Sequence, residues 1–452
     1  MKRAALFVAC AGSFLTPFMV SSLNVALASI GKEFDLSAVA LSWIPTAYLL
    51  AAAVFLVPFG RLADIHGRKM VFLYGVVLYT VACLLLPFSQ SAAMLISFRV
   101  LEGIGSAAMF GTGTAILTSV YPLGERGKAL GINIGFIYAG LSLGPPIGGA
   151  LTQYMTWRSI FFVNVLVGSV VIAAILWKLK GEWAEARGEK FDMTGSLTYG
   201  LALTALIVGL SLLPQLSAVW PVLAGLAGLA FFVFWETRSK SPVLNMQLFR
   251  RSPVFAWSSA AALINYSATA AVGFLLSLYL QYIKGFSPQG AGLVLIAQPV
   301  LMAVLSPIAG RLSDRIEPRI VASAGMAFTT AGLVTLIFLD QGTGLWLVVL
   351  ALVLLGLGFG LFSSPNTNAV MSSVEKKFLG VASGTVSTMR LLGQMLSMAV
   401  ALMLFSLFIG SAHIEPASYP KFISAERTAF IIFAAMCVFG IFASLSRGKM
   451  RQ

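Results

Sequence analysis

Charged residues are scarce in this sequence. Asp, Glu, Lys and Arg together make up 10% of its 452 residues, whereas a soluble globular domain carries about a quarter. Hydrophobic residues make up 58% of the chain. This composition excludes an ordinary soluble protein and predicts an all-α polytopic membrane protein, because helices satisfy their own backbone hydrogen bonds in lipid.

Cysteine and histidine are also rare, with three and two residues. Cys10, Cys83 and Cys437 fall inside apolar runs without metal-ligand spacing, so we interpret them as small packing residues. His66 and His413 lie in separate predicted loops and cannot form a metal or catalytic cluster. The glycine-rich loop that binds nucleotide phosphates is missing as well. We therefore expect no metal, no cofactor and no enzymatic activity, which leaves an ion gradient as the energy source.

Acidic residues are fewer than basic ones, 16 against 30, which gives a net charge of +14. In a soluble protein this excess would suggest nucleic acid as a partner. Here about 23 Lys and Arg residues fall in loops assigned to the inner face and about five in outer loops, the positive-inside pattern. We expect a multi-pass protein of the plasma membrane with both termini cytoplasmic, and no nucleic acid partner.

Long apolar runs are what the sequence has in abundance. Stretches of about 20 apolar residues, long enough to cross a bilayer, occur about 14 times. They lie near 5–30, 41–60, 71–88, 92–119, 128–151, 159–178, 194–213, 217–235, 254–282, 287–310, 319–338, 344–371, 378–410 and 427–446. The first run resembles a cleavable secretory signal, but its length predicts an uncleaved helix.

The runs divide into groups at two charged linkers, Lys178–Asp192 and Glu236–Pro253. Six spans precede the first linker and six follow the second. The predicted domains are 1–180, a six-helix bundle; 181–253, the linkers and two extra transmembrane helices; and 254–452, a second six-helix bundle. The extra pair has few hydrogen-bonding side chains, so we expect it to fill space and face lipid.

A charged loop stands between the second and third spans, from Gly60 through Asp64, Gly67 and Arg68 to Lys69. A weaker copy, 310–319, places Asp314 at the equivalent point of the second half. Such loops must be short turns at a membrane face, and two copies suggest related halves. Each loop alone could be only a solvated turn.

The fifth span is rich in glycine and contains two adjacent prolines. Small residues spaced four apart let helices approach closely, and each proline removes a backbone donor and bends the helix. Packing alone would explain the glycines. The residues of this motif are Gly140, Gly144, Pro145, Gly148 and Gly149, preceded by Gly131 and Gly135.

Arg99 and Glu102 lie deep within the fourth span, three residues apart and so on one helix face. Charges at this depth are costly and usually mark function. The alternative is a local ion pair that neutralises itself. Arg390 is a further intramembrane charge, and polar residues of other spans could line the same cavity as Arg390: Ser21, Asn24, Tyr48, Asn265 and Gln298.

These segments together resemble the major facilitator superfamily, specifically its 14-helix drug:proton antiporter branch. The resemblance rests on 60–70, 99–105, 140–149 and 156–164, with support from 24–27 and 390–393, and it spans nearly the whole chain. It implies a major facilitator fold of two six-helix bundles plus two inserted helices, opening alternately to either side.

The resemblance also implies roles for particular residues. Gly60, Asp64, Gly67, Arg68 and Asp314 would belong to a cytoplasmic gate between the bundles. Arg99 would take part in proton transfer, and the Gly144-Pro145 segment would shape the bundle interface.

One departure from the family pattern concerns acidic residues. Relatives often carry an acid in the first helix where Met19 stands here, and a Gln where Glu102 stands. Glu102 is then the one deep acid that we predict. We hypothesise that Glu102 carries the proton, with Arg99 as its charge partner. So few acids would favour neutral, monocationic or anionic amphiphiles over dications.

The expected function is export of lipophilic or amphiphilic drugs or toxic compounds from the cytoplasm in exchange for protons, by a functional monomer in the bilayer. The alternative is export of one endogenous metabolite, lipid or siderophore-like anion with weak or no proton coupling. A membrane sensor or scaffold is a third class, against which the lack of a predicted soluble domain argues.

Overall fold

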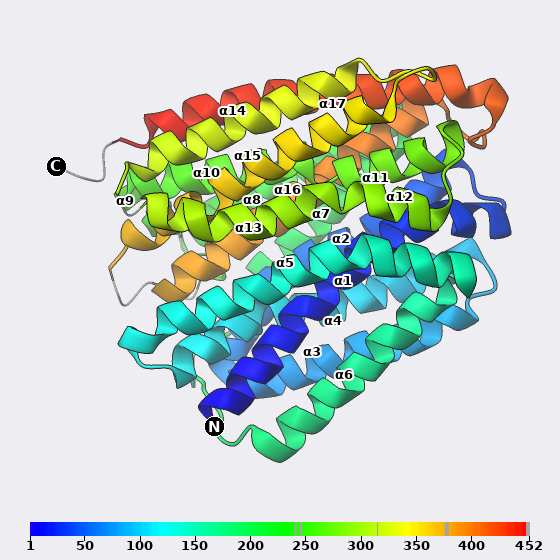
Figure 1. The fold of residues 1–452 in the computed structure, drawn as a ribbon. Helices are drawn as coiled ribbons and strands as arrows, with labels where there is room; N and C mark the ends of the chain where they lie inside the picture. Colours follow the sequence, from blue (N-terminus) through cyan, green and yellow to red (C-terminus); the bar gives the residue numbers. More distant parts are fainter. Residues whose placement is uncertain (240–241, 245, 314, 376–378, 449–452) are drawn as a thin grey trace. The chain divides into compact units, whose positions relative to one another are not determined.

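The structure is a computed structural model that describes residues 1–239, 242–244, 246–313, 315–375 and 379–448 (Figure 1). These ranges contain helices and loops and no β-strand. The elements in chain order are α1 (Lys2–Glu33), α2 (Ala38–His66), α3 (Arg68–Leu85), η1 (Leu86–Phe88), α4 (Ala92–Val120), α5 (Leu123–Tyr154), α6 (Arg158–Lys178), α7 (Met193–Leu212), η2 (Leu216–Ala218), α8 (Val219–Glu236), α9 (Met246–Arg251), α10 (Pro253–Thr269), α11 (Val272–Leu278), η3 (Tyr279–Ile283), α12 (Pro288–Leu295), α13 (Ala297–Ser313), α14 (Pro318–Ile337), α15 (Leu345–Ser372), α16 (Leu379–Phe408), η5 (Pro416–Ser418) and α17 (Tyr419–Ser446).

Within the described ranges, 14 helical segments are long and apolar enough to cross a membrane. This confirms the predicted all-α polytopic fold. Two of the spans are interrupted: Pro253–Ile283 contains α10, α11 and η3, and Pro288–Ser313 contains α12 and α13. The turn η3 is π-helical, a form that often appears at functional sites.

The start of the last helix differs from the prediction. The predicted span begins at residue 427, whereas α17 begins at Tyr419 with Pro420 in its first turn, where proline is well tolerated. Lys421, Glu426 and Arg427 lower the local hydropathy and made this stretch look like a loop. Glu426 is nevertheless inside the helix and 1% exposed. The prediction that Glu102 is the one deep acid was therefore wrong.

The chain divides into two compact units, each described here by itself. Unit 1 comprises Met1–Leu23, Trp43–Gly144 and Ala150–Asn245. Unit 2 comprises Asn24–Ser42, Pro145–Gly149 and Met246–Gln452. In unit 1, α3 packs on α4 and α6, and α7 packs on α8. In unit 2, α15 packs on α13 and α14, and α17 packs on α10, α14 and α16.

Serine residues begin several helices by accepting a backbone hydrogen bond, as expected of N-caps. Ser91 accepts from Met94 N at the start of α4. Ser252 and Ser287 cap α10 and α12, and each is followed by a proline at the first helical position. These caps define where the membrane helices begin.

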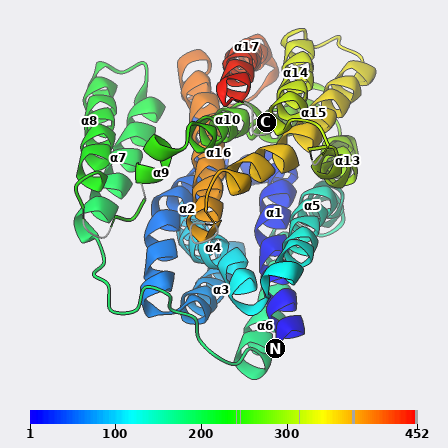
Figure 2. The same ribbon diagram turned by 90° about the vertical axis from the view of Figure 1, so that its left-hand side faces the viewer.

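The helices α7 and α8 form a hairpin in unit 1 (Figure 2). Asp192 caps α7 by accepting from Gly195 N at 2.8 Å, and it also accepts from Trp235 Nε1 at 2.9 Å. The Tyr199 hydroxyl donates to Ala53 O of α2 at 3.2 Å. Most large side chains of α8 face outward.

Candidate functional site

The charged pair of α4 is a buried ion pair. Arg99 Nη1 lies 2.5 Å from Glu102 Oε2, and the two side chains are 1% and 0% exposed. Arg99 Nε donates to Ile44 O of α2 at 3.3 Å. The local ion pair that the sequence allowed is therefore present, and helix α2 contributes to its environment.

An aromatic side chain covers the pair. The Arg99 guanidinium carbon lies 4.4 Å from the centre of the Tyr48 ring, a distance at which cation and ring attract each other. The Tyr48 hydroxyl and Ser106 Oγ are 2.7 Å apart. The structure thus brings Tyr48, predicted as a cavity residue, together with Arg99 and Glu102.

Two glycines allow α4 to approach its neighbours closely enough to enclose the pair. A Cβ at Gly103 would lie 2.9 Å from Ala51 Cβ of α2. A Cβ at Gly105 would lie 2.8 Å from Gly75 O of α3. Both distances are shorter than a normal contact, so side chains at these positions would push the helices apart.

The second carboxylate oxygen of Glu102 distinguishes this site from an ion pair in which both oxygens have hydrogen-bond partners. Oε1 is buried and has no hydrogen-bond partner among the described residues. A carboxylate oxygen left unpaired in apolar surroundings is costly, and protonation removes that cost. The arrangement can therefore bind and release a proton while Arg99 remains in place.

The loop after α2 is held by a different ion-pair network in unit 1. Arg68 Nη2 lies 2.8 Å from Asp64 Oδ1, and Arg68 Nη1 lies 2.8 Å from Glu185 Oε1. Arg68 Nη1 also donates to Ser119 Oγ at 2.6 Å, near the end of α4. Gly67 has a φ of 127°, which favours glycine at this turn.

The segment that follows α6 folds back onto this loop. The Glu182 carboxylate accepts from Lys69 N at 2.7 Å and from Met70 N at 3.1 Å, so it caps the N-terminus of α3. Arg61 and Glu189 form a further pair at 2.5 Å. The sequence showed a charged linker here, but nothing in it indicated these long-range partners.

The other two predicted gate residues are Gly60 and Asp314. Gly60 lies in α2, where an added Cβ would meet no unit 1 atom within 4 Å. Asp314 lies outside the described residues. The role of Asp64, Gly67 and Arg68 in a gate remains a prediction.

The glycines of α5 bring it close to α1. A Cβ at Gly140 would lie 2.6 Å from Phe14 O. Ser22 Oγ donates to Gly144 O at 3.0 Å, and Ser21 Oγ donates to Pro17 O at 2.8 Å. Ser21, another predicted cavity residue, is thus engaged at this α1–α5 contact within unit 1.

The same spacing does not produce close packing earlier in α5. Within unit 1, a Cβ added at Gly131 or Gly135 would meet no atom within 4 Å. Regular spacing of glycines defines a strip on the helix but not what lies opposite it, so a close approach at these two positions stays a prediction.

The remaining residues of the motif belong to unit 2. A Cβ at Gly149 would lie 2.9 Å from Gln289 Cα of α12, and one at Gly292 would meet the backbone of Pro145. Gly148 lies between Pro145 and Gly149 in α5. Here the fifth span contacts α12 directly.

The other predicted cavity residues are in unit 2. Asn265 is fully buried in α10, and its side-chain atoms have no hydrogen-bond partner in the part of the chain that the structure describes. The Arg390 guanidinium lies 5.5 Å from the ring centre of Tyr266, the residue that follows Asn265 in α10. Asn24 accepts from Ser277 Oγ at 2.7 Å through its backbone oxygen, and Gln298 is half-buried in α13.

Arg447 is a buried cation that the sequence placed in an inner loop. Its Nη1 lies 3.1 Å from Asn366 Oδ1 and 3.2 Å from Ser258 Oγ. Burial, reinforced by Arg319, lowers the pKa of Arg447 to about 10. Hydrogen bonds that Arg447 donates to these neutral groups offset part of the cost of burying its charge.

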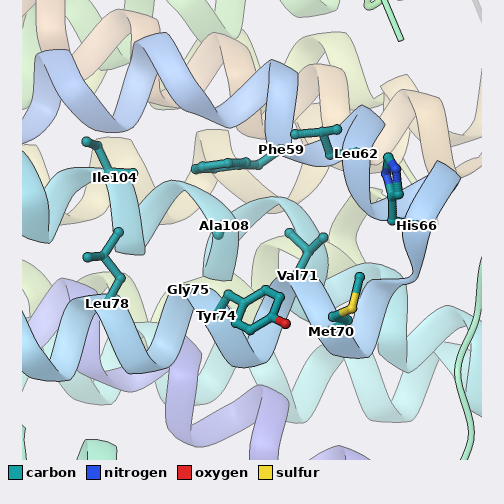
Figure 3. A pocket seen from close by; sticks show the side chains of 10 residues that line it. All are labelled: Phe59, Leu62, His66, Met70, Val71, Tyr74, Gly75, Leu78, Ile104 and Ala108. Carbon is teal, nitrogen blue, oxygen red and sulfur yellow. The ribbon is translucent and has the colours of Figure 1, made fainter. Parts of the chain in front are cut away.

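A separate apolar cavity of about 260 Å³ lies in unit 1 between α2, α3 and α4 (Figure 3). Phe59, Leu62, Tyr74, Leu78 and Ile104 line it, and His66 lies at one end. None of the residues that we predicted as site residues lines this cavity.

Comparison with known families gives a match over nearly the whole chain. The profile described as Major Facilitator Superfamily matches residues 9–397 and, in a second match, residues 258–449.

Two curated relatives align along most of their length. The Riboflavin transporter RibZ of Clostridioides difficile (strain 630) is 27% identical over 97% of this chain and 96% of its own. The Multidrug resistance protein Stp of Mycobacterium tuberculosis (strain CDC 1551 / Oshkosh) is 31% identical over 92% of this chain and 78% of its own.

Among solved structures, a bacterial homolog of the human lysosomal transporter Spinster has the same fold. It aligns with a TM-score of 0.67 and covers 98% of this chain and 97% of that one, at 16% sequence identity.

Proposed function

The chain belongs to the Major Facilitator Superfamily and is a multi-pass membrane transporter, and from this premise we propose that it exports lipophilic or amphiphilic compounds from the cytoplasm in exchange for protons. The exchange proceeds by alternating access, and the protein acts as a monomer in the plasma membrane with both termini cytoplasmic. No nucleotide takes part; the proton gradient supplies the energy.

The observation that carries the proton exchange is the buried pair on α4. Glu102 is 0% exposed, one of its oxygens contacts Arg99, and the other has no described hydrogen-bond partner. Ionisable side chains buried in a membrane helix are costly and usually functional. Glu102 binds the proton, and Arg99 favours its release by stabilising the carboxylate.

We assign two further roles, one to the ion-pair network of the loop after α2 and one to the glycines of α5. Asp64, Gly67 and Arg68, with Asp314, belong to the cytoplasmic gate, and the network with Glu185 holds Arg68 in position. Gly140 and Gly144 let α5 slide against α1, and Pro145 with Gly148 and Gly149 continues this smooth surface.

Substrate class is supported by two features. A relative at 31% identity is named as a multidrug resistance protein. The predicted cavity residues include Arg390 and no acid, so the charge pattern disfavours dications and favours neutral, monocationic or anionic amphiphiles. The residues that we expect to contact the substrate are Ser21, Asn24, Tyr48, Asn265, Gln298 and Arg390.

The alternative is transport of one endogenous metabolite, lipid or siderophore-like anion with weak or no proton coupling. It is supported by the relative named as a riboflavin transporter, which aligns along 97% of this chain. Met19, in place of the acid that family members often carry, also favours weaker coupling.

The test is substrate-triggered proton release in inverted membrane vesicles, using ethidium, a lipophilic monocation, as the probe. Wild type and Glu125→Gln are expected to collapse an imposed pH gradient when ethidium is added. Glu125 is an exposed acid paired with Lys2, so its replacement is a matched control. Glu102→Gln is expected to abolish the response.

A full response in Glu102→Gln would end the proposed role of Glu102. Ethidium flux without any pH response in the wild type would exclude antiport and favour the alternative. In that case riboflavin is the next probe, and narrow specificity under competition would identify a single-metabolite exporter.

A further inference from the structure

Glu426 is a second acid buried in the membrane part of the chain. It lies in α17, seven residues after the helix begins at Tyr419, and is 1% exposed. Neither carboxyl oxygen has a hydrogen-bond partner among the described residues. The adjacent cation does not compensate it, because Arg427 donates from Nε to Ile337 O at 3.0 Å.

The surroundings of Glu426 in unit 2 are apolar. Phe422, Ala425 and Phe430 on the same helix are each fully buried. The Phe422 ring packs against Phe405 of α16, with the ring centres 5.5 Å apart and the ring planes tilted by 48°. Such a setting disfavours a negative charge.

The titratable groups around Glu426 are few. The elements that pack against α17 carry Arg319 on α14, Tyr266 on α10 and Arg390 on α16. Arg319 begins its helix, whereas Arg427 contacts the other end of α14, about 27 Å away at 1.5 Å per residue. Arg390 and Tyr266 lie together, 15 residues along α16 from the Phe405 contact.

Tyr279, in the π-helical turn η3, is a further fully buried titratable group of unit 2. Its hydroxyl donates to Asp340 O at 2.6 Å. Asp340 is exposed, and a hydrogen bond from Thr343 lowers the pKa of its carboxyl. On the same side, Lys284 Nζ donates to Gln341 O at 2.6 Å.

The energetics determine the state of this carboxyl. An unpaired carboxylate in an apolar interior costs several kcal/mol, so the group binds a proton instead. The ionised form requires water or a cation at α17. Any conformation that admits water there therefore changes the proton affinity of Glu426.

We propose that Glu426 is a proton-binding site of unit 2 that exchanges its proton with water when a conformation of the protein admits water to α17. On release, the O–H bond of the Glu426 carboxylic acid breaks and the proton passes to that water, which leaves the carboxylate. That this proton contributes to transport rests on the proposed exchange mechanism, but binding itself does not.

The test is labelling of the purified full-length protein with dicyclohexylcarbodiimide, which reacts with protonated carboxyl groups in apolar surroundings. Mass spectrometry of the peptide containing residue 426 is expected to show an adduct. Its rate is expected to fall about tenfold for each pH unit above the titration midpoint. Glu426→Gln removes this adduct, and Glu102→Gln retains it.

Absence of the adduct at every pH, or a rate independent of pH, would overturn the proposal. Because the wild type gives this result by itself, a poorly folded variant does not obscure it.

This experiment needs no substrate and no gradient. It can therefore succeed where ethidium fails to release protons, which would separate a proton-binding site from antiport. Conversely, antiport with an unlabelled Glu426 would leave Glu102 as the proton carrier and reject the second site.

Discussion

Arg68 and Glu185 are 117 positions apart, yet Arg68 Nη1 lies 2.8 Å from Glu185 Oε1. The pair joins the first residue of α3 to the segment after α6. Glu182 and Glu189 extend the contact on either side. The linker between α6 and α7 is therefore an ordered part of unit 1.

Replacing Glu182 with Ala removes the cap of α3. Because the carboxylate accepts two backbone N–H groups, we expect a loss of about 1 kcal/mol in the free energy of unfolding. Limited proteolysis should also cut residues 182–189 sooner. Lys180→Ala changes an exposed charged residue of the same linker and is the control; equal protease sensitivity in both variants would contradict the role of Glu182 in holding the linker.

The buried pair on α4 should behave as a coupled unit. Arg99→Met alone leaves Glu102 buried without its cation, for which we expect a loss of about 3–5 kcal/mol. The double variant Arg99→Met/Glu102→Leu should recover most of this loss. Thermal unfolding of the purified variants measures the coupling. Additive losses would mean that the two side chains do not stabilise each other.

Two glycines of α5 provide a matched comparison. Gly140→Ala places a Cβ 2.6 Å from Phe14 O, so we expect lower thermal stability and loss of transport. The Cβ that Gly131→Ala adds would have no unit 1 atom within 4 Å. Alanine is also more favourable than glycine inside a helix by about 0.5–1 kcal/mol. We expect Gly131→Ala to be as stable as wild type or more so. The opposite order would show that the α1–α5 approach is adjustable.

An acid placed at position 19, where relatives often carry one, is expected to destabilise this protein. Met19 is fully buried, so Met19→Asp would bury a charge at a cost of about 2.5–3.5 kcal/mol. We expect poorer expression and a lower unfolding temperature, with Met19→Leu as the neutral control. A stable Met19→Asp variant that exports dicationic dyes would mean that this position reaches water.

Sequence reasoning found the features that depend on local pattern. Hydropathy located the spans, and the three-residue spacing of Arg99 and Glu102 placed them on one face, where they pair. Glu426 was missed because Lys421 and Arg427 flank it and the three together read as a loop. Only the packing of α10, α14 and α16 around α17 shows that it is buried.

Contacts between residues far apart in the chain could likewise not be predicted from the sequence. Gly131 and Gly140 belong to the same kind of spacing, but only Gly140 faces the backbone of α1. The acids at 182, 185 and 189 lie in the charged linker Lys178–Asp192, and nothing local specifies that they meet the start of α3, Arg68 and Arg61.

The α7–α8 hairpin has a practical consequence for handling the protein outside its membrane. Trp220 is 75% exposed, Leu223 is 51% exposed and Phe234 is 49% exposed. After extraction, a detergent belt must cover this surface, because few protein contacts do so. Short-chain detergents that form small micelles should loosen the hairpin first, and lipid nanodiscs should hold it in place. The choice of solubilising agent will therefore decide whether preparations of this transporter retain all 14 spans in their native arrangement.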